Sequence, residues 1–153
     1  MHRTGSKLIA QNRKARHDYE FLSVYEAGLV LKGTEIKSIR DKKANIQQAY
    51  VRPRNGELWL IGANIATYSH GNRENHEPTR ARKLLLHRKE IAKILGRLQN
   101  NGITIVPVKL YLKEGRAKLE IAVGRGKQKQ DKRQSLAKKD AQRNIARSLK
   151  GRY

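Results

Sequence analysis

The stretch ITIVPVKLYLKEGRAKLEIAV, residues 103–123, decides the fold of this chain. Its apolar and β-branched runs predict two strands, over 103–112 and 117–123, and the Glu114-Gly115 pair between them is typical of a hairpin turn. Pro107 cannot donate to a sheet ladder, so we expect it at a strand edge or a bulge. The segment therefore predicts an antiparallel strand pair.

Further strands are predicted nearer the N-terminus. Residues 19–31 alternate weakly and turn at Glu26-Ala27-Gly28, which indicates a hairpin with glycine in the left-handed conformation. Residues 45–52 and 57–67 predict two strands around Arg54-Asn55-Gly56, a strong hairpin signal. Several antiparallel strands around one small core favour a closed barrel, because closure removes exposed edges.

Two helices are predicted between these strands. Thr34 suits an N-cap, and Glu35 favours the first turn of a short helix over 35–41. After a polar loop over 68–80, a second helix has apolar residues at i, i+3, i+4 and i+7 and is followed by an Asn-Gly pair. Its residues are Ile91, Ile94, Leu95, Leu98, Asn101 and Gly102.

The chain is strongly basic, with a formal charge of +22 on 153 residues. The length suits one domain, residues 1–124, followed by a basic tail, residues 125–153. Eleven Lys or Arg and two Asp give the tail +9, which leaves +13 on the domain itself. A field of this sign concentrates polyanions, so nucleic acid is the leading partner.

The tail has two faces if it is helical. Ala137, Ala141, Ile145 and Leu149 recur every fourth residue, and the basic residues Lys139, Arg143 and Arg147 recur at the same spacing, offset by two. Two residues of α-helix turn by about 200°, so the two sets lie on opposite faces. Alone the tail buries too little to offset its ordering entropy, and we expect it to be disordered when free and helical on an elongated acidic partner. A disordered solubilising tail is the alternative.

The sequence gives little indication of a metal site or a catalytic site. The five histidines are His2, His17, His70, His76 and His87. The spacing of His70 and His76 matches no common zinc pattern, and the chain contains no cysteine. His17-Asp18 and His76-Glu77 are conceivable acid–base pairs, but a loop histidine beside basic residues is more often a phosphate or base contact. We expect no enzyme activity, no metal and no cofactor.

Membrane insertion is not expected either. No apolar run reaches the roughly 20 residues that span a bilayer, and Met1–Arg16 lacks an apolar block of signal-peptide length. An anionic membrane surface ranks second as a partner, because the tail is poor in the residues that interfacial helices bury. We expect a cytoplasmic monomer.

Three basic clusters carry the nucleic-acid prediction. They are Arg13-Lys14-Ala15-Arg16, Arg80-Ala81-Arg82-Lys83 and the run from Arg125 to Arg133. Each lies beside a predicted strand, where it can hold phosphates in register. Only eight residues are aromatic, which favours recognition of folded RNA by its shape over stacking of splayed bases.

Several short motifs occur in order along residues 8–147. They are Asn12-Arg13-Lys14-Ala15, His17-Asp18-Tyr19, Glu26-Ala27-Gly28, Gly33-Thr34-Glu35-Ile36-Lys37-Ser38-Ile39-Arg40, Lys43-Ala44-Asn45-Ile46, Pro78-Thr79-Arg80-Ala81-Arg82-Lys83-Leu84-Leu85-Leu86 and Asp131-Lys132-Arg133. With these motifs the chain resembles the bacterial SmpB family of tmRNA-binding (SsrA-binding) small proteins. The resemblance implies a six-stranded antiparallel barrel of the oligonucleotide-binding type, with two or three short helices.

The resemblance also implies a function. The barrel would bind the tRNA-like domain of tmRNA and enter stalled ribosomes to begin trans-translation. The tail would occupy the empty mRNA channel past the small-subunit decoding centre. Alanyl-tRNA synthetase and elongation factor Tu would act on the same RNA, and the protein itself would perform no bond chemistry.

The candidate site residues, taken from the basic clusters, the tail spacing and the resemblance together, fall into two groups. The RNA-binding group is Asn12, Arg13, Lys14, His17, Glu26, Arg80, Arg82, Lys83, Leu85 and Lys118. The ribosome-binding tail group is Arg125, Lys127, Lys129, Gln130, Asp131, Lys132, Arg133, Lys139, Arg143 and Arg147. A carboxylate such as Glu26 repels phosphate, so it should accept hydrogen bonds from base amino groups or riboses. A turn role for Glu26 and a core role for Leu85 are the alternatives.

The chain departs from the family pattern in the tail, where Gln130 stands in place of Tyr or His. A ring there could stack on a ribosomal base, a contact worth about 1–3 kcal/mol, whereas Gln can still hydrogen-bond. Gln128 removes one positive charge and Lys129 restores it. Two other functions stay open: a barrel that binds ribosomal RNA constitutively, and a small basic ribonuclease.

Overall fold

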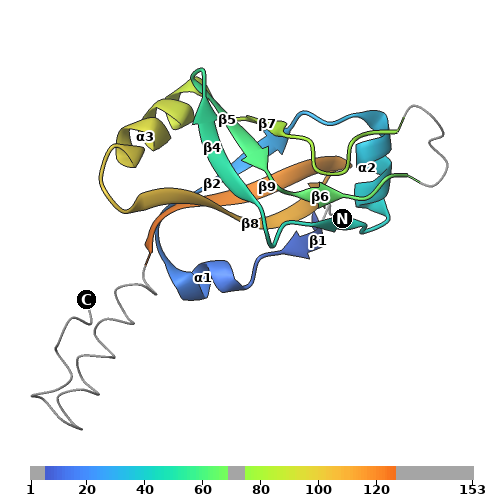
Figure 1. The fold of residues 1–153 in the computed structure, drawn as a ribbon, viewed down its shortest axis with the longest axis horizontal. Coiled ribbons are helices and arrows are strands. Elements are labelled where there is room, and N and C mark those ends of the chain that lie inside the picture. Colours follow the sequence, from blue (N-terminus) through green and yellow to red (C-terminus); the bar gives the residue numbers. More distant parts are fainter. Residues whose placement is uncertain (1–5, 69–74, 127–153) are drawn as a thin grey trace, which may run out of the picture.

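The computed structural model describes residues 6–68 and 75–126, which form a mainly β structure with three helices (Figure 1). The strands are β1 (Ser6–Gln11), β2 (Tyr19–Leu29), β3 (Ala44–Asn45), β4 (Tyr50–Arg54), β5 (Glu57–Ile61), β6 (Asn64–Ile65), β7 (Arg82–Leu85), β8 (Ile103–Lys113) and β9 (Arg116–Gly126). The helices are α1 (Lys14–Asp18), α2 (Gly33–Arg40) and α3 (Arg88–Leu98). The predicted mainly β class is confirmed.

The β8–β9 hairpin forms as the sequence predicts. Glu114 and Gly115 connect the strands with φ angles of 53° and 78°, the left-handed pair that a tight hairpin turn requires. The register shifts between Pro107 and Lys109, so Pro107 lies at a bulge as expected. β8, β9 and β2 each have 11 residues, and β9 joins β8 to β2, the central strand of the sheet.

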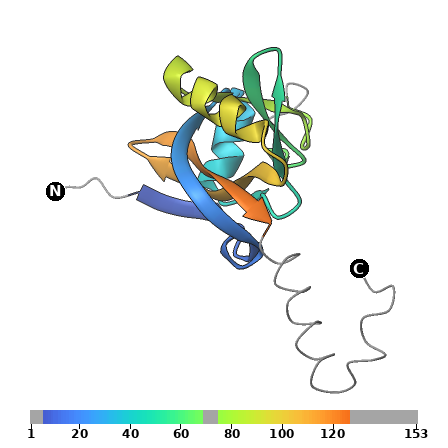
Figure 2. The same ribbon diagram turned by 90° about the vertical axis from the view of Figure 1, so that its left-hand side faces the viewer.

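The expected closed barrel is not what the described residues form. Seven strands make one antiparallel sheet in the order β1-β8-β9-β2-β7-β5-β4, and β3 pairs only with β6. The sheet curls, and β4 lies against β8 (Figure 2), but no ladder joins the edge strands β1 and β4 across the described residues. Closure needs matched tilt and stagger at both edges, and Pro53 removes a donor from β4.

The predicted hairpin over 19–31 is wrong, because β2 runs through it without a turn. Gly28 does not adopt a positive φ and instead pairs with Leu85 on β7 and Lys118 on β9. A Cβ added to Gly28 would lie 3.3 Å from the Cβ of Leu85. Glycine at this position therefore permits a close approach of the Leu85 side chain and does not form a turn.

The second predicted hairpin is confirmed at its turn, where Asn55 and Gly56 have φ angles of 54° and 77°. Its flanking strands are shorter than expected, since 45–52 divides into β3 and β4 and 57–67 divides into β5 and β6. Gly62, with φ at 82°, interrupts the second strand beside the carbonyl of Gln48. Strands β1 and β7 and helix α1 were not predicted.

The two longer helices lie close to their predicted ranges. The first begins at Gly33 and its N-cap is Lys32 rather than Thr34, with the side chain of Glu35 accepting the Lys32 N–H at 2.7 Å. The second ends as expected before Gly102, whose φ is 83°. Both helices pack into the main core with the concave face of the sheet, among Ile39, Leu58, Leu84, Ile94, Leu119 and Ile121.

Candidate nucleic-acid interface

Three of the predicted RNA contacts meet in one hollow on the outer face of the sheet. Glu26 on β2, Leu85 on β7 and Lys118 on β9 line it, and the pairing of Gly28 with both neighbours brings them together. The hollow has a volume of about 330 Å³ and is completed by Gly28, Leu86, His87 and Glu90. Leu85 is 50% exposed whereas Leu84 is fully buried, so Leu85 is not a core residue.

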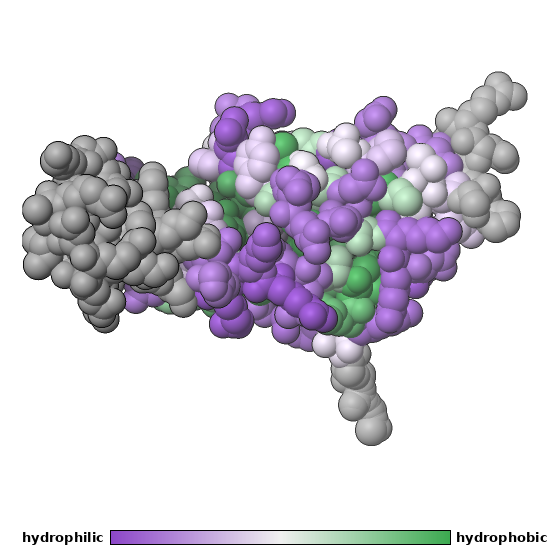
Figure 3. Space-filling model, turned by 60° about the horizontal axis from the view of Figure 1, so that its bottom comes forward, coloured by the Kyte–Doolittle hydropathy of each residue, from purple (hydrophilic) through white to green (hydrophobic). Residues whose placement is uncertain are grey.

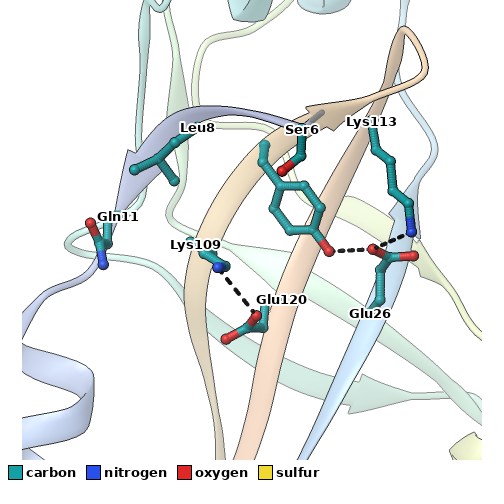
Figure 4. Close-up of a pocket in the computed structure, with 8 residues that line it drawn as sticks. Ser6, Leu8, Gln11, Glu26, Lys109, Lys113 and Glu120 are labelled. Atoms are coloured by element: carbon teal, nitrogen blue, oxygen red, sulfur yellow. Dashed lines mark hydrogen bonds and ion pairs between the residues drawn. The ribbon is translucent and has the colours of Figure 1, made fainter. Parts of the chain in front are cut away.

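The carboxylate of Glu26 is held by neighbouring strands. The hydroxyl of Tyr111 on β8 donates a hydrogen bond to Glu26 Oε2, and Lys113 Nζ lies 3.5 Å from the same oxygen (Figure 4). The Tyr111 hydrogen bond lowers the pKa of Glu26 against the opposing effect of partial burial, with further lowering from Lys113 and Lys118. Among the described residues no donor contacts Oε1, so one oxygen of a stable anion stays available.

Tyr111 was not among the predicted site residues. The alternation of Lys109, Tyr111 and Lys113 along β8 could have placed it on the outer face, but no local pattern pairs it with Glu26. It also lines a second hollow of about 470 Å³, with Ser6, Leu8, Gln11, Glu26, Lys109, Lys113 and Glu120. Lys109 Nζ and Glu120 Oε1 approach to 3.7 Å in this hollow (Figure 4). Figure 3 shows one face of the molecule where hydrophilic side chains surround small apolar areas.

Asn12, Arg13 and Lys14 lie together at the junction of β1 and α1, away from the Glu26 hollow. The Asn12 backbone N–H donates to the Val108 carbonyl at 2.8 Å, and its side chain reaches the Pro107 carbonyl at 3.4 Å. Arg13 and Lys14 are exposed and line a separate hollow of about 310 Å³ with Gln47 and Gln48. The structure thus divides the predicted RNA contacts between two places.

His17 is an exposed residue of α1 beside these basic side chains. Its Nδ1 lies 3.1 Å from Asp18 Oδ1, and its side chain is 76% exposed. The ring can therefore reach a ligand at the surface.

The predicted contacts Arg80 and Arg82 both bind Glu35 of α2; Arg82 is fully buried, whereas the Arg80 side chain is 24% exposed. Arg82 Nε donates to Glu35 Oε2 at 2.7 Å, and Arg80 Nη2 donates to Glu35 Oε1 at 2.6 Å. Arg82 and Glu35 are fully buried, and the other hydrogen bonds of Arg82 go to the carbonyls of Ala63, Glu77 and Pro78. Two motifs that look separate in the sequence therefore form one ion network around the buried Glu35.

Charge in this network is preserved despite its burial. Burial alone would raise the pKa of Glu35, but hydrogen bonds from Arg80, the Lys32 N–H and Arg82 outweigh it and lower that pKa. Burial lowers the pKa of Arg82, and Glu35 opposes that change. The network fixes the start of β7, and with it the positions of Lys83 and Leu85 on the outer face.

His76 is a buried part of the scaffold and not a loop contact. Its Nε2 lies 2.8 Å from the Ile65 carbonyl and its Nδ1 lies 2.8 Å from Thr34 Oγ1. A neutral ring satisfies both bonds if Nε2 donates and Nδ1 accepts from the hydroxyl. Thr34 thus lies inside the first turn of α2, after its N-cap Lys32, and its hydroxyl contacts His76.

The remaining predicted residues can be placed only in part. Arg125 is exposed near the end of β9, opposite Glu20 and Ile103. Outside the described residues lie His2, His70, Lys127, Lys129, Gln130, Asp131, Lys132, Arg133, Lys139, Arg143 and Arg147. Within the described ranges no three His, Asp or Glu cluster as a metal site would require, and no helix there is long and apolar enough to cross a membrane.

Known proteins match this chain along nearly its whole length. A family model described as SmpB protein matches residues 9–151. The SsrA-binding protein of Desulforudis audaxviator is 50% identical over 152 residues, 99% of each chain. That of Halalkalibacterium halodurans is 53% identical, covering 98% of this chain and 97% of its own. A solved structure described as "tmRNA-SmpB: a journey to the center of the bacterial ribosome" is 47% identical with a TM-score of 0.63, covering 76% of this chain and 82% of its own.

Proposed function

We propose, because this chain belongs to the SmpB protein family, that it binds the tRNA-like domain of tmRNA (SsrA RNA) and delivers it to stalled ribosomes for trans-translation. The protein acts by binding and performs no bond chemistry. It works in the cytoplasm as a monomer, and alanyl-tRNA synthetase and elongation factor Tu are partners only through the RNA.

The observation that carries this proposal is the hollow formed by Glu26, Leu85 and Lys118. On a chain of charge +22, a carboxylate held as an anion weakens general phosphate binding, so its presence favours a specific donor. Base amino groups and ribose hydroxyls are such donors in folded RNA. Leu85 offers an apolar contact to a base, and Lys118 can bind an adjacent phosphate.

The residues Asn12, Arg13, Lys14 and His17 form the second part of the interface. Their exposure and charge suit phosphate contacts, which position a folded RNA without reading its sequence. Lys83 belongs to the outer face, whereas Arg80 and Arg82 support the interface by holding β7 to α2 through Glu35. The curled sheet serves as an oligonucleotide-binding scaffold although its edges are open.

The tail, residues 125–153, is assigned to the ribosome, although its first two residues, Arg125 and Gly126, still pair with β2. Its basic residues would follow the empty mRNA channel past the decoding centre, becoming helical there because the RNA neutralises one face. Gln130 would contribute a hydrogen bond at the position where the family pattern has a ring. The charge and two-faced spacing of the tail support this assignment.

The test is competitive binding of the full chain to the tRNA-like domain of tmRNA against excess bulk tRNA, repeated across salt concentrations. We expect selective binding that survives moderate salt, because shape-specific contacts add to counterion release. Equal, weak binding to both RNAs that falls steeply with salt would overturn the proposal. That result would instead support a generic ribosome-associated protein.

A further inference from the structure

Gly28 lies inside the sheet, at a position where strands usually carry a side chain. It belongs to β2 and pairs with Leu85 on β7 and with Lys118 on β9. Glycine weakens a strand interior, because it has no side chain to pack and loses more backbone freedom on folding than other residues. Its φ is not positive, so left-handed backbone does not account for it.

The Leu85 side chain occupies the space that a side chain at position 28 would take. A Cβ added to Gly28 would lie 3.3 Å from Leu85 Cβ, 3.6 Å from its Cδ1 and 3.9 Å from its Cγ. The terminal methyl carbon Cδ1 is nearer to that point than Cγ, so the leucine leans over β2. Leu85 is nevertheless 50% exposed. It therefore lies across the glycine with one side open to solvent.

Gly124 on β9 shows how a glycine that serves only the packing of this sheet differs. A Cβ added there would lie 2.6 Å from the backbone carbonyl oxygen of Glu20, so the strands themselves would have to move. At Gly28 the three nearest atoms all belong to the half-exposed Leu85 side chain, which would have to give by a few tenths of an ångström. The fold can therefore accept a small side chain at position 28, and the position of Leu85 is what would change.

Neither member of the Gly28–Leu85 pair suits stability alone. A half-exposed leucine gains little from apolar burial, and the glycine beside it contributes no side-chain packing. Such departures from local preference are typical of functional sites. Both residues line the hollow that also contains Glu26 and Lys118. The pair therefore departs from local preference where the candidate interface lies.

We propose that Gly28 is a positioning residue, which lets Leu85 lie across β2 so that one nucleobase can pack on the leucine while its edge donates to Glu26. A side chain at position 28 would turn Leu85 away from β2, and the apolar contact and the acceptor would no longer meet the same base. The inference rests on the proposed function, and the occupant is a base of the tRNA-like domain. It assigns selectivity to a residue that has no side chain of its own.

The first test compares Gly28→Ala with Gly96→Ala in the full chain. Gly96 is exposed on α3, and a Cβ added there meets no atom within 4 Å. Both variants are titrated with the tRNA-like domain and with bulk tRNA across salt concentrations, and thermal unfolding confirms that they are folded. We expect Gly28→Ala to lose about five- to tenfold in affinity for the tRNA-like domain, with an unchanged salt slope because no charge is altered. Bulk tRNA should bind within about twofold of wild type.

Two further measurements separate positioning from a general loss of stability. In a Leu85→Ala background, Gly28→Ala should change the affinity by less than about twofold, because the residue through which it acts is gone. In NMR spectra of the free protein, Gly28→Ala should shift the methyl signals of Leu85 and leave those of the buried Leu58 and Leu84 in place. An equal loss of affinity in the Leu85→Ala background, or a loss without movement of the Leu85 signals, would contradict the inference.

A second pair of variants tests the same geometry without changing Gly28. Leu85→Ile branches at Cβ, the atom already closest to β2, so the side chain cannot lie over the glycine, whereas the unbranched Leu85→Met can. We expect the Ile variant to lose about five- to tenfold in affinity for the tRNA-like domain and the Met variant to stay within about twofold. Wild-type affinity in either Leu85→Ile or Gly28→Ala would overturn the inference. Selective binding by the wild type is measured in the same titrations, so the proposed function and this inference fail separately.

Discussion

The hydroxyl of Tyr111 donates to Oε2 of Glu26 across β9, which lies between their two strands. The hydrogen bond occupies one carboxylate oxygen of Glu26, a residue that also lines the hollow with Leu85 and Lys118. Tyr111 is therefore a positioning residue for the proposed acceptor. Burial and the neighbouring Glu26 raise the pKa of Tyr111, so its hydroxyl remains a donor at every physiological pH.

Tyr111→Phe should weaken binding of the tRNA-like domain by about three- to tenfold at neutral pH, because Glu26 loses the bond that orients it. Tyr111 is the largest cause of the lowered Glu26 pKa, so the variant raises that pKa. Binding that needs the carboxylate is complete above this pKa and is lost as pH falls through it. The variant should therefore lose affinity at a higher pH than wild type.

Affinity measured downward from neutral pH, together with the carboxyl carbon NMR titration of Glu26, checks this prediction. Tyr25→Phe on β2 is the control, since it removes a hydroxyl from a different tyrosine of the same sheet. Identical pH profiles for wild type and Tyr111→Phe would show that the tyrosine only packs.

Glu26→Lys should weaken binding of the tRNA-like domain although it adds positive charge. The substitution removes the acceptor and places a third ammonium beside Lys113 and Lys118. Bulk tRNA, which binds through phosphates, should not lose affinity. Filter binding of both RNAs measures the contrast, and a higher affinity for the tRNA-like domain would mean that Glu26 accepts nothing from it.

Glu35→Gln should destabilise the fold by about 3–5 kcal/mol, because it leaves Arg82 buried without its counter-charge. Glu57→Gln is the matched control at a surface pair and should cost less than about 1 kcal/mol. Denaturant unfolding measures both, and equal costs would contradict a special role for the buried network.

The destabilisation caused by Glu35→Gln has a pH dependence of known sign. The folded pKa of Glu35 is lowered, so its stabilisation is present above the unfolded pKa and is lost as pH falls through the folded value. The difference in unfolding free energy between wild type and Glu35→Gln should therefore become smaller in acid. If this difference in unfolding free energy became larger as pH falls, Glu35 would not be an anion in the folded protein.

Gly124→Ala should destabilise the protein by about 1–3 kcal/mol through overpacking. A Cβ at this position would lie 2.6 Å from the backbone carbonyl oxygen of Glu20, where β2 and β9 approach closely. Gly126→Ala, two residues along the same strand, meets no atom within 4 Å and serves as the control. If the two variants unfolded at the same temperature, β2 and β9 would be able to move apart at little cost in free energy.

Truncation after Gly126 should leave affinity for the tRNA-like domain within about threefold and abolish tagging of stalled chains. The cut is placed there because Arg125 and Gly126 still pair with Glu20 and Tyr19 on β2. RNA binding and a translation assay with a message lacking a stop codon measure the two activities. Parallel loss of both would contradict the division of labour between domain and tail.

Local sequence patterns were sufficient for the tight turns and for the end of α3, although they misplaced the N-cap of α2 and missed α1. The turns at Asn55-Gly56 and Glu114-Gly115 and the end of α3 before Gly102 were predicted, because left-handed backbone and helix periodicity act over a few residues. The same reasoning failed for Gly28, whose close neighbour is Leu85, a residue on another strand. It also could not predict that Arg82 is buried, since the sequence around a basic residue beside a strand is the same whether its side chain is buried or exposed.

The sequence by itself determined the mainly β class, the basic charge, the two tight turns and the family motifs. Only the tertiary structure decided that β2 is continuous, that the sheet stays open, that Arg82 is buried against Glu35 and that Tyr111 holds Glu26. These last two contacts join residues 47 and 85 positions apart in the chain. Such partners are chosen by strand order and register, which emerge only when all the strands pack around one core.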